Sequence, residues 1–225
     1  RATITSQIEH HAILHACASI ERLGYPVAYL PVDNEGIVSP DILSSFITDE
    51  TRLVSVMLVN NEIGTIEPIS ELAKVAHSHG AVFHTDAVQA VGHIAINVKE
   101  LGIDMLSASA HKFNGPKGIG FIYIKSGTKI YPYADGGAQE HGMRAGTENI
   151  ASIVGMAAAL KKNCDHMDQT QNKLHQLEDK FLDVLKLSGI DFIRNGSANH
   201  IPGNVNVSIR NASGEMLLHR LDLKS

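Results

Sequence analysis

The residues with the clearest chemical potential lie together in the segment 109–112, Ser-Ala-His-Lys, and a glycine-rich turn follows them directly. Lys112 comes just after residues 104–109, a run of β-forming character, so we expect it at the end of a strand. A primary amine in that position can attack a carbonyl carbon and form an imine. Beside it, the hydroxyl of Ser109 and the imidazole of His111 can bind a phosphate group.

A second strand-like run, residues 81–85, ends in Asp86, and Gln89 follows three positions later. A carboxylate at a strand end can pair with a protonated ring nitrogen. An imine-forming lysine, an acid for a ring nitrogen and donors for a phosphate are the parts that pyridoxal phosphate (PLP) requires. The pattern therefore predicts a PLP site.

Each of these residues has a simpler explanation when it is taken singly. Lys112 can be an ordinary surface lysine, and Asp86 can cap a helix that begins at Ala87. The strand end beside His111 favours a functional lysine instead. We expect its amine to be desolvated there, which lowers the pKa of an ammonium group.

A metal site and a dinucleotide site are two other possibilities that the sequence supports only weakly. His11 and His15 have the i, i+4 spacing of metal ligands, but no Glu or Cys completes the set and HExxH is absent, so no metal is predicted. We expect His10 to be a flat ring at a strand-to-helix junction, able to stack on a planar cofactor. No GxGxxG follows a strand and opens a helix, which argues against dinucleotide binding.

Composition narrows the class of protein further. The chain has 225 residues, is 44% hydrophobic and carries a formal charge of −5. The lack of a long basic run excludes nucleic acid as the expected partner, and the lack of an apolar run of about 20 residues excludes a membrane span. Cys17 and Cys164 form no CxxC, which favours a reducing, cytoplasmic location. The chain begins without Met and inside a strand pattern, so we interpret it as an internal piece of a longer protein.

Strand and helix patterns alternate, which predicts an α/β fold with a mainly parallel sheet flanked by helices. The predicted division is a large cofactor-binding domain at 1–165, followed at 166–225 by a linker helix and the start of a small α+β domain. On the linker helix, charged residues such as Glu178 are expected to form the solvated face. Expected strands are residues 2–6, 27–30, 53–59, 81–85, 104–109, 120–124 and 205–209, and expected helices are 9–23, 70–79, 150–162, about 174–189 and 214–223, with a short one opening at Ser39.

Seven segments together resemble the cysteine desulfurases, the class V aminotransferase-like branch of fold-type I PLP enzymes. They occur in family order and reach to about residue 155, beyond which only general character matches. The segments are 5–10 (TSQIEH), 59–64 (VNNEIG), 84–89 (HTDAVQ), 109–112 (SAHK), 115–120 (GPKGIG), 136–140 (GGAQE) and 144–149 (RAGTEN).

The resemblance implies a role for each residue. Lys112 would hold PLP covalently and act as base and acid at the substrate α-carbon. Asp86 would keep the pyridinium nitrogen protonated, and His10 would stack on the ring and relay protons. Asn61 and Gln89 would bind near the phenolic oxygen, Ser109 and His111 would bind the phosphate, and Thr147 would reach the phosphate of a neighbouring subunit in a homodimer.

The implied reaction converts L-cysteine to L-alanine and leaves the sulfur on a protein cysteine as a persulfide. That sulfur would pass to acceptor or scaffold proteins for iron–sulfur cluster assembly. Three family elements have no counterpart here: the upstream glycine-rich phosphate loop, the arginine for the substrate carboxylate and the nucleophilic cysteine. Neither Cys17 nor Cys164 suits the last role, so we expect the chain alone to be inactive.

Two alternatives remain open at the level of the sequence. Within the superfamily, a selenocysteine lyase or another class V aminotransferase shares the logic of Lys112 and Asp86. From a different class, the chain can be a non-catalytic scaffold for sulfur-transfer partners. Visible colour with added cofactor separates an intact lysine site from an inert scaffold.

Overall fold

The computed structural model describes residues 1–224 and contains a six-stranded sheet in the order β2-β1-β3-β4-β5-β6. All neighbouring pairs are parallel except β5 and β6, which are antiparallel. The predicted mainly parallel α/β sheet is therefore confirmed. The strands are β1 (Ala2–Ser6), β2 (Val27–Leu30), β3 (Thr51–Ser55), β4 (Val82–Asp86), β5 (Met105–Ser109) and β6 (Gly120–Ile124), with a separate antiparallel pair of β7 (Phe192–Arg194) and β8 (Val207–Ile209).

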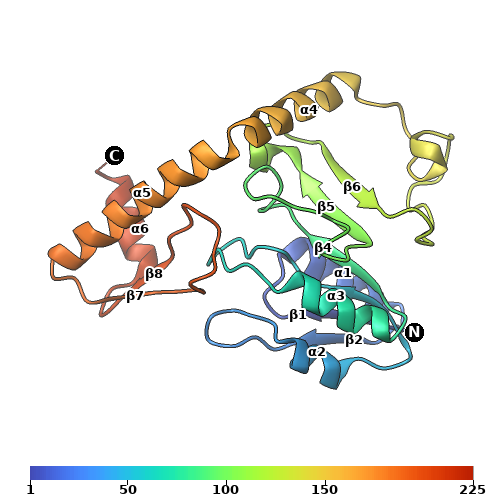
Figure 1. Cartoon of the computed structure of the whole chain (residues 1–225), viewed down its shortest axis with the longest axis horizontal. Helices are drawn as coiled ribbons and strands as arrows, with labels where there is room; N and C mark the ends of the chain where they lie inside the picture. The colour runs from blue at the N-terminus through green and yellow to red at the C-terminus, as the bar shows by residue number, and fades with distance from the viewer. Residues whose placement is uncertain (225) are drawn as a thin grey trace.

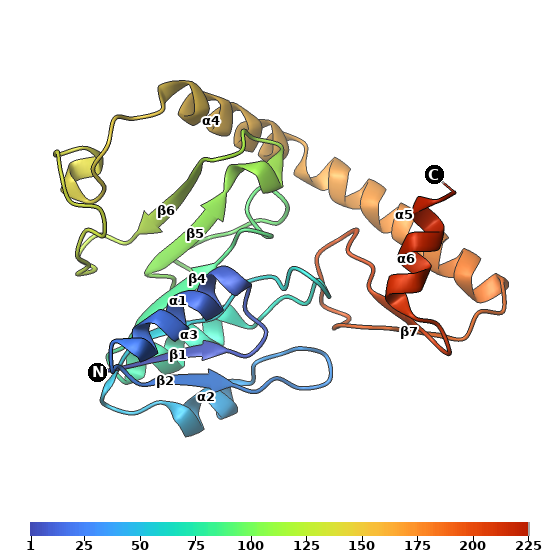
Figure 2. The ribbon, with the colours of Figure 1, turned by 180° about the vertical axis from the view of Figure 1, so that it is seen from behind.

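Helices cover both faces of the sheet. The two opposite views place α1 on one face and α2 and α3 on the other (Figures 1 and 2). A long helical arm, α4 and then α5, leaves the edge of the sheet near β5 and β6 and leads to α6 (Figure 1). The helices are α1 (His11–Arg22), α2 (Pro40–Phe46), α3 (Ile69–Ser78), α4 (Ile150–Asp165), α5 (Met167–Leu187) and α6 (Gly214–Asp222).

Local sequence explains where several of these elements begin. Ser39 caps α2 by accepting a hydrogen bond from the Asp41 amide, and Pro40 occupies the first turn, where its missing N–H costs nothing.

The core lies between the sheet and its helices, with fully buried residues such as Phe83 and Leu72. Burial of these apolar side chains is the main force that holds the layers together.

The predicted strand at 53–59 is longer than the assigned one. Strand β3 ends at Ser55, although the Val56 and Leu58 amides still donate to the carbonyls of His84 and Asp86. The extended path therefore continues beside β4 while the pairing with β1 stops. A continuous apolar run indicates that the chain is buried on both faces of the sheet. Here the burial continues past the end of β3, where the chain no longer pairs with strands on both sides.

The expectation of a solvated Glu178 is wrong. Its side chain is buried, with Oε1 at 2.6 Å from the Arg194 guanidinium and 2.7 Å from His200 Nε2, and with Oε2 accepting from the Gly203 amide. Burial alone would raise the pKa of this carboxyl, but the hydrogen bonds from Gly203 and His200 and the nearby charges hold it below its usual range. Glu178 therefore fastens α5 to the β7–β8 segment.

The C-terminal segment contacts the sheet domain at two places, the loop 60–66 and the loop after β4, where Gln171 Nε2 donates to His93 O at 2.6 Å. The Ile66 amide donates to Asn199 O, and the Ile201 amide donates to Gly64 O. Helices α4 and α5 meet at His166, where the predicted division between 1–165 and 166–225 falls, and that division stays a prediction. None of the helices described is both long enough and apolar enough to cross a membrane.

Candidate active site

The carboxyl ends of four strands carry most of the residues singled out by the sequence. In a parallel sheet these ends meet at one edge, which is where α/β folds bind ligands. The register pairs Asp86 of β4 with Ser107 of β5, so the segments that follow these two strands leave the sheet side by side. His10 follows β1, Asn61 follows β3, Asp86 and Gln89 belong to the end of β4 and its loop, and Ser109, His111 and Lys112 belong to the end of β5 and its turn.

Asp86 is a buried carboxylate whose hydrogen bonds are only partly satisfied. Asp86 is 7% exposed, and its Oδ1 accepts from the Val88 amide at 2.9 Å. Burial raises the pKa of this carboxyl, while the Val88 amide and the nearby His10 ring act to lower it. No α-helix is assigned at Ala87, but Asp86 does cap the turns that follow it, because Oδ1 accepts from the Val88 amide. The capping role therefore uses one carboxylate oxygen and leaves the other for a ligand.

His10 lies at the junction between β1 and α1, as predicted. It is the N-cap of α1, and its Nδ1 accepts from the Ala12 amide at 3.2 Å, so the proton of the neutral ring is on Nε2. The ring is exposed and close enough to Asp86 to act on its charge. Two of the predicted site residues are thus brought together by β1 and β4.

Glu9 fixes the junction that presents His10, a role that was not predicted from the sequence. It is 5% exposed, and its Oε1 accepts from Ser6 Oγ at 2.7 Å and from the Met57 amide at 2.8 Å. These bonds join the end of β1 to the chain that follows β3. Burial raises the pKa of Glu9 to about 7.

Lys112 lies in a single turn of 3₁₀ helix, Ala110–Phe113, directly after β5. The turn is anchored by Phe113, which is fully buried. The two proposed phosphate ligands are in contact, with Ser109 Oγ at 2.8 Å from His111 Nδ1. Lys112 is exposed, so the expectation of a desolvated amine is wrong for this chain.

A row of hydrogen-bonded polar groups crosses the sheet two residues before Asp86 on β4 and Ser109 on β5. The His84 ring bridges Ser55 Oγ, at 2.8 Å from Nδ1, and Ser107 Oγ, at 2.9 Å from Nε2. Burial lowers the pKa of His84 to about 4, so the ring is neutral at physiological pH. The charges at the edge are therefore those of Asp86, Lys112 and their neighbours.

Asn61 and Gln89 are half-buried in the loops after β3 and β4. The residue that holds the first of these loops is Asn60, whose Oδ1 accepts from the amides of Glu62 and Ile63 and whose Nδ2 donates to Ile8 O. An asparagine that bonds to the backbone two residues ahead is a recognisable turn signal, so this role was readable from the sequence.

Thr147 is not brought to the other residues. It is exposed on the segment between β6 and α4, which projects beyond the edge of the sheet (Figure 1). Within the described part of the chain, no hydrogen bond links Thr147 to the Lys112 turn. Its proposed contact with a neighbouring subunit stays a prediction.

Comparison with known proteins places this geometry in a family. A family model described as Aminotransferase class-V matches residues 1–224. The chain belongs to this family. It is 50% identical over 222 residues to a cysteine desulfurase IscS of Dictyoglomus turgidum, covering 98% of the chain and 56% of that protein. A second relative, cysteine desulfurase IscS of Clostridium botulinum (strain Hall), is 48% identical with coverages of 98% and 56%.

Solved structures of similar proteins share this fold. A NifS-like protein superposes with a TM-score of 0.94 at 34% identity, covering 100% of the chain and 62% of that structure. DndA from Streptomyces lividans gives a TM-score of 0.87 at 31% identity, with coverages of 99% and 63%. The chain spans about half the length of the curated relatives it matches. The resemblance read from the motifs is confirmed at the level of the family.

Class-V aminotransferases and cysteine desulfurases use PLP, and the residues at this edge fit that cofactor. The fit rests on the donor set: a primary amine on the β5 turn, a buried carboxylate with a spare oxygen on β4, an imidazole beside that carboxylate, and a paired hydroxyl and imidazole next to the amine. These are the partners required by an aldehyde, a pyridine nitrogen, a flat ring and a phosphate.

Proposed function

We propose that this chain supplies the cofactor-binding part of a PLP-dependent cysteine desulfurase, which converts L-cysteine to L-alanine. The observation that carries the proposal is the convergence of Lys112, Asp86 and His10 at one edge of the sheet, in a chain about half identical to proteins named cysteine desulfurase IscS. Selenocysteine lyases and other class V aminotransferases share the three residues. The 50% and 48% identity to proteins named cysteine desulfurase IscS supports the desulfurase over these alternatives.

Each residue has a task that its position supports. When bound, PLP would withdraw electrons from the substrate α-carbon. Lys112 would hold the cofactor and then move the proton at that carbon, and Asp86 would hold a proton on the ring nitrogen. His10 would pack on the ring and carry a proton to or from the sulfur. Asn61 and Gln89 would bind near the phenolic oxygen, Ser109 and His111 would bind the phosphate, and Thr147 would bind the phosphate of a second copy in a homodimer.

The sulfur leaves to a protein thiol, which becomes a persulfide while the substrate becomes alanine. Neither cysteine of the chain suits this step. Cys17 is 3% exposed inside the packing of α1, and burial raises the pKa of its thiol, which disfavours the reactive thiolate. Cys164 is exposed in the last turn of α4, next to Asn163, whose side chain contacts the Lys112 turn. It belongs to a helix and not to a loop that could carry a nucleophilic thiol to the substrate. We therefore place the acceptor thiol outside this chain and expect the chain alone not to release sulfur.

The partners follow from the same reaction. The persulfide sulfur would pass to acceptor or scaffold proteins of iron–sulfur cluster assembly. A cytoplasmic location fits two cysteines that are both free of disulfide bonds in the described structure.

The test has two parts. The purified chain is mixed with PLP and followed by visible absorbance, then treated with borohydride and digested to find the modified peptide. We expect modification at Lys112 and none in Lys112→Ala. In the full-length protein, alanine should form from L-cysteine without a keto acid. Alanine formation that depends on a keto acid would instead indicate a transaminase, and rapid sulfide release by the chain alone would overturn our placement of the acceptor.

A further inference from the structure

The backbone of the Lys112 turn is held by two side chains that come from distant parts of the sequence. The Lys112 carbonyl accepts from His93 Nε2 at 2.8 Å, and the Phe113 carbonyl accepts from Asn163 Nδ2 at 3.1 Å. Carbonyls at the end of a helical turn have no partner within the turn, so they must find one elsewhere. Here both receive a side-chain donor.

The turn depends on such support because it is short. A four-residue 3₁₀ helix has poor internal hydrogen bonds and little stability of its own. Within the described chain, no hydrogen bond or ion pair is made by the Lys112 ammonium. The direction of its side chain is therefore set by the backbone from which it projects.

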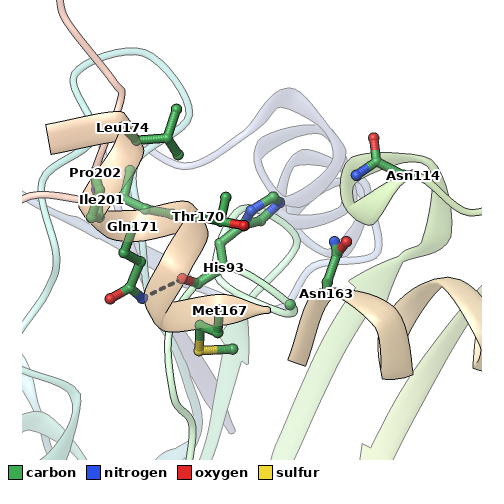
Figure 3. Close-up of a pocket in the computed structure, with 10 residues that line it drawn as sticks. His93, Asn114, Asn163, Met167, Thr170, Gln171, Leu174, Ile201 and Pro202 are labelled. Carbon is green, nitrogen blue, oxygen red and sulfur yellow. Dashed lines mark hydrogen bonds between the residues drawn. The ribbon is translucent and has the colours of Figure 1, made fainter. Parts of the chain in front are cut away.

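His93 is itself fixed from two sides. Its amide donates to Ala90 O at 3.0 Å, and its carbonyl accepts from Gln171 Nε2 on α5 at 2.6 Å. Figure 3 shows His93 between α5, which carries Gln171, and Asn163 of α4, on the wall of a cavity of about 130 Å³. The His93 backbone, from which the imidazole projects, is thus held beside the junction of α4 and α5.

His93 also connects the loop after Asp86 to the turn that carries Lys112. His93 lies in the loop that follows Asp86, and its ring bonds to the Lys112 carbonyl. Asp86 itself pairs with Ser107 on the neighbouring strand β5, and β5 leads directly to the turn that carries Lys112. The carboxylate and the amine are therefore held relative to each other by the sheet on one side and by His93 on the other.

We propose that His93 and Asn163 are positioning residues, which fix the Lys112 turn so that its amine and the Asp86 carboxylate face the same ligand. The proposal rests on the proposed function, since it assumes that both groups bind one PLP molecule. The Lys112 carbonyl can only accept, so His93 Nε2 carries the proton of this bond. A glutamine at position 93 offers an N–H donor in a similar place and should preserve the bond.

The test compares His93→Leu, His93→Gln and Asn163→Asp in the purified chain. A matched control is His79→Leu, because the His79 ring also bonds to a backbone carbonyl, that of Val75, but at the end of α3 away from Lys112. The first readout is the rate at which added PLP becomes attached to Lys112. We expect His93→Leu and Asn163→Asp to slow it about tenfold or more, since small misplacements of reacting groups cost this much.

The second readout is amide hydrogen exchange of residues 110–118 without cofactor. It should rise in His93→Leu and stay near the parent value in His93→Gln and His79→Leu. Equal attachment rates and exchange in His93→Leu and His79→Leu would overturn the proposal. Unchanged attachment of PLP to the Lys112→Ala chain, at some other residue, would instead overturn the proposed function, and the exchange measurement would still decide whether His93 holds the turn.

Discussion

Asp86 combines low exposure with an imidazole neighbour and one spare oxygen, and this combination sets what its charge can do. A carboxylate at the dry edge of a sheet acts on a neighbouring charge more strongly than one in water. Its proposed partner is a ring nitrogen that must stay protonated. The negative charge, rather than the shape of the side chain, is then the property that matters.

Asp86→Asn tests this directly. The amide oxygen can still accept from Val88, so the loop should keep its shape, but the charge is lost. We expect kcat for alanine formation by the full-length protein to fall about 100-fold or more, as when a preorganised electrostatic partner is removed. Asp33→Asn is the control, because Asp33 likewise accepts backbone amides, from Glu35 and Ile37, in a loop at the surface. Activity of Asp86→Asn within twofold of the parent would contradict the assignment.

Glu67 is a second buried carboxyl, and it makes stability depend on pH. It is 3% exposed, its Oε2 accepts from the Val38 amide at 2.8 Å, and burial raises its pKa from 4.5 to about 8. Between these values the folded chain holds a proton that the unfolded chain has lost, so stability falls as pH rises towards 8. His84 acts in the opposite sense, but only below about pH 6.5, where the unfolded ring takes up a proton. Glu9, whose pKa is about 7, acts in the same sense as Glu67 but has lost half of its proton at pH 7 and contributes less above it.

In the interval from pH 7 to pH 8, Glu67 therefore contributes more to the pH dependence than Glu9 does. We expect the parent to lose about 1 kcal/mol of unfolding free energy over this unit, and Glu67→Gln, which mimics the protonated acid, to lose clearly less. Urea midpoints at the two pH values measure the difference. Glu71→Gln, on the exposed side of α3, should behave as the parent does. An equal loss in parent and Glu67→Gln would show that this carboxyl does not titrate in that interval.

At the scale of the elements, the loop after β4 requires glycine at position 92. Its φ is +79°, and a Cβ there would lie 2.9 Å from Phe113 Cβ and 3.3 Å from Asn163 Nδ2. Gly80 has a similar φ of +72° with open space around it. The two positions separate the cost of backbone strain from the cost of crowding the Lys112 turn.

We expect Gly92→Ala to destabilise the chain by about 2 to 4 kcal/mol, and Gly80→Ala by about 1 kcal/mol, because only the first adds a steric clash to the strained φ. Urea unfolding gives both values. Attachment of PLP to Lys112 should also slow in Gly92→Ala alone. Equal destabilisation by the two substitutions would mean that Phe113 and Asn163 move aside freely.

The sequence predicted elements well where a local signal determines them. The Ser39 cap, the alternation of strands and helices, and His10 at the start of α1 all follow from such signals. It also placed Asp86 and Lys112 at strand ends, which a parallel sheet brings to one edge. These predictions needed no knowledge of which strands are neighbours.

Long-range contacts account for what the sequence did not predict. Nothing near Glu178 indicates that Arg194 and His200 will bury it, and nothing near His93 indicates a bond to the Lys112 carbonyl. The exposed Lys112 is a related case, since desolvation depends on which other segments cover the strand end. Local patterns carry no information on partners tens of residues away.

At the scale of the whole molecule, the C-terminal segment contacts the sheet domain at places that also carry site residues. Gln171 of α5 holds His93, and residues 195–206 hold the loop that includes Asn61. Asn206 Nδ2, for example, donates to Glu62 O at 3.2 Å. A shift of the C-terminal segment would therefore reach both sides of the candidate site.

Thr65 is the central residue of the second contact. It is fully buried, and its hydroxyl donates to Glu35 O at 2.7 Å and accepts from the Ser197 amide at 3.0 Å. Thr65→Val keeps the shape of the side chain but leaves both backbone groups without this partner, which costs about 1 to 3 kcal/mol. We expect amide exchange of residues 195–201 to become about tenfold faster, since a loss of 1.4 kcal/mol in local stability has that effect.

Strands β1 to β4 should keep their protection in Thr65→Val, because the substitution weakens a contact between segments and leaves the sheet intact. The control is Thr48→Val, where the lost hydroxyl accepts only from the Glu50 amide at the surface. If residues 195–201 exchange no faster in Thr65→Val than in Thr48→Val, the hydroxyl does not fasten the C-terminal segment. Faster exchange throughout the sheet would mean that the two parts unfold as one unit, and their predicted division near residue 165 would then have no energetic basis.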